Sequence, residues 1–119
     1  MEPPRDRECF SFEAKIPCGD ASSETEDECL AVTLALEMLE SDDLEGSIVW
    51  DTGIMFARLL MEETKYPNHF FTPQRSFIEL GSGCGLVGLV AALRGAQVTF
   101  TDMGGVLPRL QRNVEHNLT

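Results

Sequence analysis

Basic residues are scarce in this 119-residue sequence: 9 Lys and Arg stand against 20 Asp and Glu, giving a formal net charge of -11. A surface this acidic repels phosphate groups, so the composition argues against a nucleic-acid partner. It is compatible with a basic protein partner or a lysine-bearing substrate. Long apolar runs are also lacking, so the sequence predicts neither a membrane-spanning helix nor a membrane partner.

Metal-ligand and export patterns are absent as well. The four cysteines form no C-x-x-C pair, and the two histidines are not at metal-ligand spacing. Residues 1–20 contain acidic side chains and no continuous apolar segment, which excludes a signal peptide there. We therefore expect no metal, free thiols, and a location in the cytoplasm or also the nucleus.

Hydrophobic residues make up 43% of the chain, enough for one small domain with a core. Residues 1–28 are acidic and polar, and we expect a mobile segment, with Phe10, Phe12 and Ile16 as a candidate short edge strand. Residues 29–119 form the expected folded part. Within it, residues 29–40 alternate like a strand but have the composition of a helix.

The central feature is a strand, a glycine-rich turn, a helix and a second strand. The first strand spans about 76–80, and the turn carries Gly81, Gly83 and Gly85. An apolar helix follows to about Arg94, where Arg94-Gly95 is a stop signal. The second strand, 97–101, is expected to run parallel to the first and ends at Asp102. The fold class is therefore α/β.

Two flanking helices are predicted. Asp51 or Thr52 should cap a helix whose apolar stripe comprises Ile54, Met55, Leu59 and Leu60, and which ends before Pro67. The final helix should carry Val106, Leu107, Leu110 and Val114 on one face, with Pro108 in its first turn. Asn113 and Asn117 are interpreted as surface or capping groups of this helix.

Two classes of nucleoside ligand use a glycine turn of this kind. Dinucleotide sites require G-x-G-x-x-G, and here Leu86 occupies the third glycine position. S-adenosylmethionine has no pyrophosphate but carries an ammonium, which an acid such as Glu79 attracts. An acid about 20 residues beyond the turn suits a ribose diol in either class, and Asp102 fits. The pattern favours S-adenosylmethionine, with a nicotinamide-binding half-domain as the weaker alternative.

The chain also resembles a known family. The segments Ile48–Asp51, Glu79–Gly88, Ala91–Asp102 and Asn113-Val114-x-x-Asn117 are similar to those of the seven-strand non-histone protein lysine methyltransferases. The resemblance covers roughly residues 46–119. It implies the N-terminal part of a Rossmann-like seven-strand methyltransferase fold with an incomplete sheet, as in a shortened form of a longer enzyme. It also favours a strand of an N-terminal hairpin for residues 29–40.

The resemblance implies a function and a set of site residues. The function is S-adenosylmethionine-dependent methyl transfer to a lysine of a non-histone protein such as a chaperone, ATPase or translation factor. Gly81, Ser82 and Gly83 would line the methionine part of the cofactor, Asp102 would hold the ribose, and Trp50 would close the pocket. Catalytic residues are not indicated. The alternative function is a non-catalytic interaction module, or a short isoform that competes with the full enzyme.

Simpler structural roles compete with these assignments. Asp102 could cap the following helix, and Trp50 could be a core aromatic at a strand end. Glu79 could accept hydrogen bonds from loop amides instead of attracting an ammonium. Cys84 is interpreted as a small loop residue and not as a nucleophile, because no histidine lies near it in the sequence.

Overall fold

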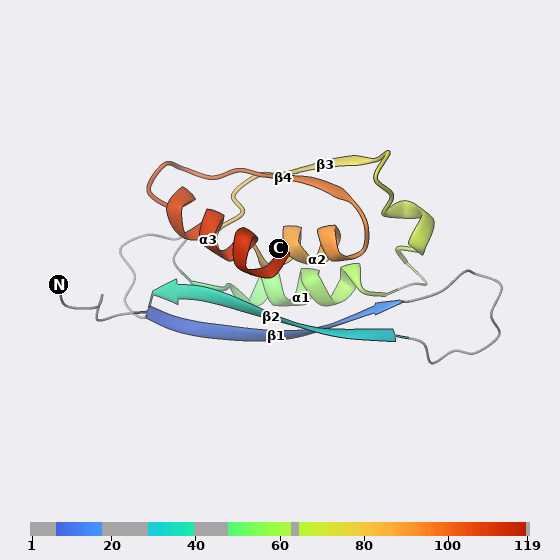
Figure 1. Ribbon diagram of the computed structural model, residues 1–119, viewed down its shortest axis with the longest axis horizontal. Coiled ribbons are helices and arrows are strands. Elements are labelled where there is room, and N and C mark those ends of the chain that lie inside the picture. The colour runs from blue at the N-terminus through green and yellow to red at the C-terminus, as the bar shows by residue number, and fades with distance from the viewer. Residues whose placement is uncertain (1–6, 18–28, 40–47, 63–64, 119) are drawn as a thin grey trace.

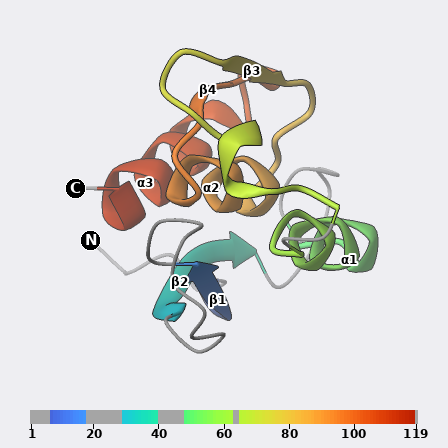
Figure 2. The ribbon, with the colours of Figure 1, turned by 90° about the vertical axis from the view of Figure 1, so that its right-hand side faces the viewer.

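The computed structural model describes residues 7–17, 29–39, 48–62 and 65–118. Its elements are β1 (Arg7–Pro17), β2 (Cys29–Leu39), α1 (Asp51–Leu60), the 3-10 turn η2 (Asn68–Phe70), β3 (Ser76–Glu79), α2 (Leu86–Leu93), β4 (Gln97–Phe100) and α3 (Leu107–Leu118). Figure 1 shows α2 and α3 between the β1–β2 hairpin and the β3–β4 pair. Figure 2 shows the same order from the side, with α1 packed against α2 and lying to one side of the hairpin. The predicted α/β class is confirmed.

The hairpin is antiparallel along its whole length, from the Arg7–Leu39 pair to the Pro17–Cys29 pair. Alternate residues face the helices, and Phe12, Ala14, Leu34 and Leu36 are buried there. The strand expected from the family resemblance for residues 29–40 is confirmed, because burial of one face outweighs helical propensity. The expected edge strand is also confirmed and is longer than predicted. Of the segment expected to be mobile, residues 7–17 form β1, and residues 1–6 and 18–28 lie outside the described residues.

Helix α1 begins and packs differently from the prediction. Its N-cap is Trp50, whose carbonyl accepts the Ile54 N–H at 3.1 Å, and no side chain caps the helix. The proposed cap by Asp51 or Thr52 was therefore wrong. Ala57 and Leu60 are buried, whereas Met55 is 68% exposed, so the predicted apolar stripe is correct only in part.

Arg94 joins α2 to the end of α1. As predicted, α2 stops here, and Gly95 follows with a φ of 110°. The Arg94 Nη1 donates to the carbonyls of Leu60 and Tyr66, both at 2.6 Å. The guanidinium also lies 4.6 Å from the centre of the Phe71 ring. A buried cation thus satisfies a carbonyl at the C-terminal end of α1, where no helical N–H is available.

Strands β3 and β4 pair in parallel, as predicted, and α2 packs against them through Gly88. A Cβ atom at Gly88 would lie 2.8 Å from the Glu79 Oε1 and 2.9 Å from the Phe100 Cδ1. The close helix–strand approach that the dinucleotide fingerprint assigns to its third glycine therefore occurs two residues beyond Leu86. On the opposite face of the pair, Ile78 and Leu80 are 68% and 83% exposed.

Helix α3 carries Pro108 in its first turn, as predicted, and buries Leu110 and Asn113. Val106, just before the helix, is also buried, whereas Leu107 is largely exposed. The helix packs against β2 and α2. Among the helices that the structure describes, none has the length and apolar character needed to cross a membrane.

Candidate active site

The glycine turn connects β3 to α2. Gly81, Gly83 and Gly85 all have positive φ, and Gly85 at 96° is the N-cap of α2. A Cβ atom at Gly81 would meet no atom within 4 Å, so the turn faces open space on this side. The missing side chains leave room for a ligand to lie over the backbone.

Ser82 fixes the turn to the end of β4. Its N–H donates to the Thr101 carbonyl at 2.8 Å, and its hydroxyl accepts the Thr101 N–H at 3.1 Å. The hydroxyl also donates to the Glu79 carbonyl at 3.3 Å. Because Ser82 is buried and engaged in these bonds, its first role is to hold the turn against the sheet.

Asp102 faces the turn from the end of β4. Its Oδ2 accepts the Gly83 N–H and its Oδ1 accepts the Met103 N–H, both at 2.7 Å. The carboxylate does not act as the cap of α3, which begins at Leu107. Each oxygen still has lone-pair capacity for a hydroxyl donor, because an ionised carboxylate accepts about four hydrogen bonds.

These groups surround a cavity of about 330 Å³ that is lined by residues from 48–53, 79–87 and 102–103. All five residues assigned to the cofactor from the sequence line it: Trp50, Gly81, Ser82, Gly83 and Asp102. Trp50 is 52% exposed, which is inconsistent with the alternative of a buried core aromatic. The volume is within the range of small-molecule sites, roughly 300 to 1,000 Å³.

Glu79 also lines the cavity. Burial raises the pKa of its carboxyl, and the nearby Asp102 carboxylate adds to this effect. The Ser82 hydroxyl and the Gly88 N–H oppose the shift. The Oε1 is buried and has no hydrogen bond of good geometry within the described part of the chain. A carboxylate in this environment would be stabilised by a cation placed in the cavity.

Cys84 is buried behind the turn. Burial raises the pKa of its thiol to about 11, although Arg109 acts in the opposite direction. The thiol therefore stays protonated at neutral pH, in agreement with the prediction that it is not a nucleophile. Across residues 7–17, 29–39, 48–62 and 65–118, no group of three His, Cys, Asp or Glu side chains could hold a metal ion.

Asn113 is a residue that the sequence interpretation placed wrongly. It is 2% exposed, and its side chain contacts both the hairpin and the glycine turn. It lies three residues after the buried Leu110, so it belongs to the inner face of α3. The sequence contained one signal for this buried role: Asn113 is a polar residue at a position of the helix where the spacing predicts an apolar one.

The structure is an α/β fold with a cavity beside the glycine turn. The profile of the lysine methyltransferase family matches residues 31–119, and the chain belongs to that family. The family resemblance seen in the sequence is thereby confirmed.

Individual relatives are similar to only part of the chain. The protein N-lysine methyltransferase METTL21A of Mus musculus is 63% identical over 74 residues, which are 61% of this chain and 31% of that protein. METTL21A of Xenopus tropicalis is 42% identical over 73 residues, with 61% and 32% covered. The protein-lysine methyltransferase METTL21E of Bos taurus is 37% identical over 78 residues, with 66% and 26% covered. The chain thus spans about a quarter to a third of these relatives.

Proposed function

We propose that the protein binds S-adenosylmethionine and takes part in methyl transfer to a lysine of a non-histone protein in the cytoplasm or nucleus. The observation that carries the proposal is the cavity in which the glycine turn, Trp50 and Asp102 meet. Membership of the lysine methyltransferase family and the names of the relatives support it. The acidic composition is compatible with a lysine-bearing protein substrate.

The residues around the cavity fit the chemistry of this cofactor. Asp102 offers free acceptor capacity to ribose hydroxyls while it holds the Gly83 N–H. Glu79 places a carboxyl group in the cavity wall, which suits a ligand ammonium. Gly81 leaves open space above the turn for the methionine part. Trp50 supplies an aromatic surface at the rim.

When bound, S-adenosylmethionine would supply a methyl group on a sulfonium: a neutral lysine amine forms a bond to the methyl carbon, the carbon–sulfur bond breaks, and S-adenosylhomocysteine leaves. The chain's own contribution at this site is to hold the reactants in line and to exclude water. The glycine turn and Asp102 would hold the cofactor. Orientation depends on a rigid turn, and the bonds of Ser82 to Thr101 and of Gly83 to Asp102 provide that rigidity.

Isothermal titration calorimetry of the 119-residue chain with S-adenosylmethionine tests the proposal. Asp102→Asn is the sharpest variant, because its remaining oxygen can still accept one loop N–H. We expect roughly 10- to 100-fold weaker binding, since charged hydrogen bonds to the ribose are lost. Circular dichroism is the control for folding. Equal affinity of the variant, or no binding by the folded parent chain, would rule the assignment out.

A non-catalytic interaction module is the second candidate. The exposed Ile78 on the outer face of β3 and the exposed Leu80 just after the strand favour it, because neighbouring exposed apolar side chains often mark binding surfaces. A methyl-transfer assay with radiolabelled cofactor and a lysine-bearing protein substrate separates the two candidates. Incorporation of label that depends on Asp102 would exclude the non-catalytic module.

A further inference from the structure

Two asparagines on α3 bind the free edge of β2. Asn117 accepts the Ala35 N–H and donates to the Ala35 carbonyl, both at 2.9 Å. Asn113 makes the same pair of bonds with Glu37, at 2.8 and 3.0 Å. Ala35 and Glu37 are two residues apart, so their backbone groups point to the same edge of the strand. The two side-chain amides thus occupy the place of a neighbouring strand.

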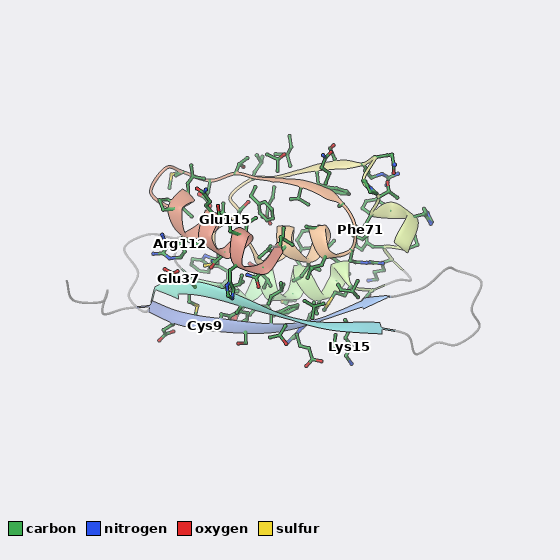
Figure 3. All side chains as sticks on the ribbon, viewed as in Figure 1. Cys9, Lys15, Glu37, Phe71, Arg112 and Glu115 are labelled. Carbon is green, nitrogen blue, oxygen red and sulfur yellow. The ribbon has the colours of Figure 1, made fainter. Side chains whose placement is uncertain are left out.

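The two asparagines differ in their third hydrogen bond. The Asn117 Nδ2 donates to the Asn113 carbonyl at 2.7 Å, within α3 itself. The Asn113 Nδ2 donates instead to the Cys84 carbonyl at 2.9 Å, in the glycine turn. Asn113 therefore connects the hairpin, α3 and the turn, whereas Asn117 connects only the hairpin and α3. Figure 1 shows α3 beside β2, and Figure 3 labels Glu37 and Arg112 at this junction.

The bond to Cys84 fixes a peptide group in the middle of the turn. The Cys84–Gly85 peptide has its carbonyl bound to Asn113 and its N–H bound to the Ser82 carbonyl at 2.9 Å. Both ends of this peptide are therefore held. The orientation matters because it accompanies the left-handed conformation of Gly85, from which α2 begins.

We propose that Asn113 is a positioning residue for the glycine turn, and that it couples the hairpin to the affinity for S-adenosylmethionine. The inference rests on the proposed function. Asn113 is not among the residues that line the cavity, so its effect passes through the Cys84 carbonyl. Loss of its amide leaves that carbonyl without its donor in a buried setting, which favours rotation of the peptide.

The two asparagines give a matched pair of variants, Asn113→Ala and Asn117→Ala. Both remove a pair of bonds to β2, so both should lower the stability, and Asn113→Ala should do so by more because it also leaves the buried Cys84 carbonyl without its donor. Only Asn113→Ala should weaken S-adenosylmethionine binding, by roughly tenfold, because only it releases the turn. The amide signal of Gly85 in NMR provides a second readout, and we expect its exchange with solvent to accelerate only in Asn113→Ala.

Asn113→Asp serves if the alanine variant does not fold. Its carboxylate still accepts the Glu37 N–H but, when ionised, cannot donate to the Cys84 carbonyl, so binding should weaken as in the alanine variant. Equal losses of affinity in the Asn113 and Asn117 variants would overturn the proposal, as would an unchanged Gly85 signal in Asn113→Ala. Failure of the parent chain to bind the cofactor would refute the proposed function, and the Gly85 signal would still decide whether Asn113 positions the turn.

Discussion

Substitution of Gly88 by alanine tests the contact between α2 and the β3–β4 pair. In an isolated helix this change is favourable by about 1 kcal/mol, because alanine has the higher helical propensity. In the structure the new methyl group would lie 2.8 Å from the Glu79 Oε1 and 2.9 Å from the Phe100 Cδ1. Neither neighbour can move freely, since Phe100 packs against the core and the Glu79 Oε1 is buried.

The magnitude follows from the competition of these two effects. Forcing an extra carbon into a packed site costs about 1–3 kcal/mol, and contacts below 3 Å with both Phe100 and Glu79 place Gly88 toward the upper end. We therefore expect Gly88→Ala to lower the free energy of unfolding by about 1–2 kcal/mol in total. Gly53 is the matched control, because its Cβ would meet only the Val87 Cγ2 at 4.0 Å. Gly53→Ala should raise the stability by about 0.5 kcal/mol.

Urea denaturation followed by circular dichroism measures both effects, provided that the slope of the transition is the same in all variants. A double-mutant cycle with Phe100→Leu adds a second test. Removal of the ring edge should reduce the cost of Gly88→Ala, because the two side chains would no longer overlap. The reasoning is refuted if Gly88→Ala stabilises the protein as much as Gly53→Ala does.

Three further predictions concern Glu79, Cys84 and Arg94. Folding raises the pKa of the Glu79 carboxyl above 4.5, so the native state binds this proton more tightly than the unfolded state does. The free energy of unfolding should therefore fall as the pH rises from 4.5 through the raised pKa. Urea denaturation at several pH values measures this fall, and Glu79→Gln should remove it. With a thiol pKa of about 11, Cys84 should resist iodoacetamide at neutral pH while the exposed Cys9 reacts, and equal labelling in peptide mass spectrometry would contradict this. Arg94→Leu should lower the free energy of unfolding by about 2–4 kcal/mol, because two carbonyls lose their donor. Arg112→Leu removes only the half-exposed 2.9 Å ion pair with Glu37 and should lower it by less than about 1 kcal/mol. Similar losses of stability in thermal unfolding would refute this distinction.

Local patterns predicted the unit from β3 to β4 because its signals lie within the same short segment. Glycines mark the turn, and Arg94-Gly95 marks the end of α2. The strand for residues 29–40 depended on the family resemblance, since its composition favours a helix and only pairing with β1 decides the matter. This strand is stabilised by contacts with residues that are remote in the sequence, and helical or strand propensity does not describe such contacts.

The same reason explains why Gly88 and Asn113 were not predicted. Gly88 is required by the ring of Phe100, 12 residues further along the chain, and by Glu79 on β3. Asn113 is required by Glu37, 76 positions away, and by Cys84, 29 positions away. A single sequence shows an asparagine on a helix, but it does not show that the facing element is a strand edge whose backbone groups this side chain binds.

The bonds around the turn have a consequence for how a ligand would bind. Its backbone is held at three successive residues: Ser82 by Thr101, Gly83 by Asp102 and Cys84 by Asn113. A ligand therefore does not have to order this segment, and less conformational entropy is lost on binding. The same arrangement means that Asp102 must bind a ribose without releasing Gly83. The two roles are compatible only if the ligand uses the remaining lone pairs of the carboxylate, because competition for the occupied ones would loosen the turn that binds it.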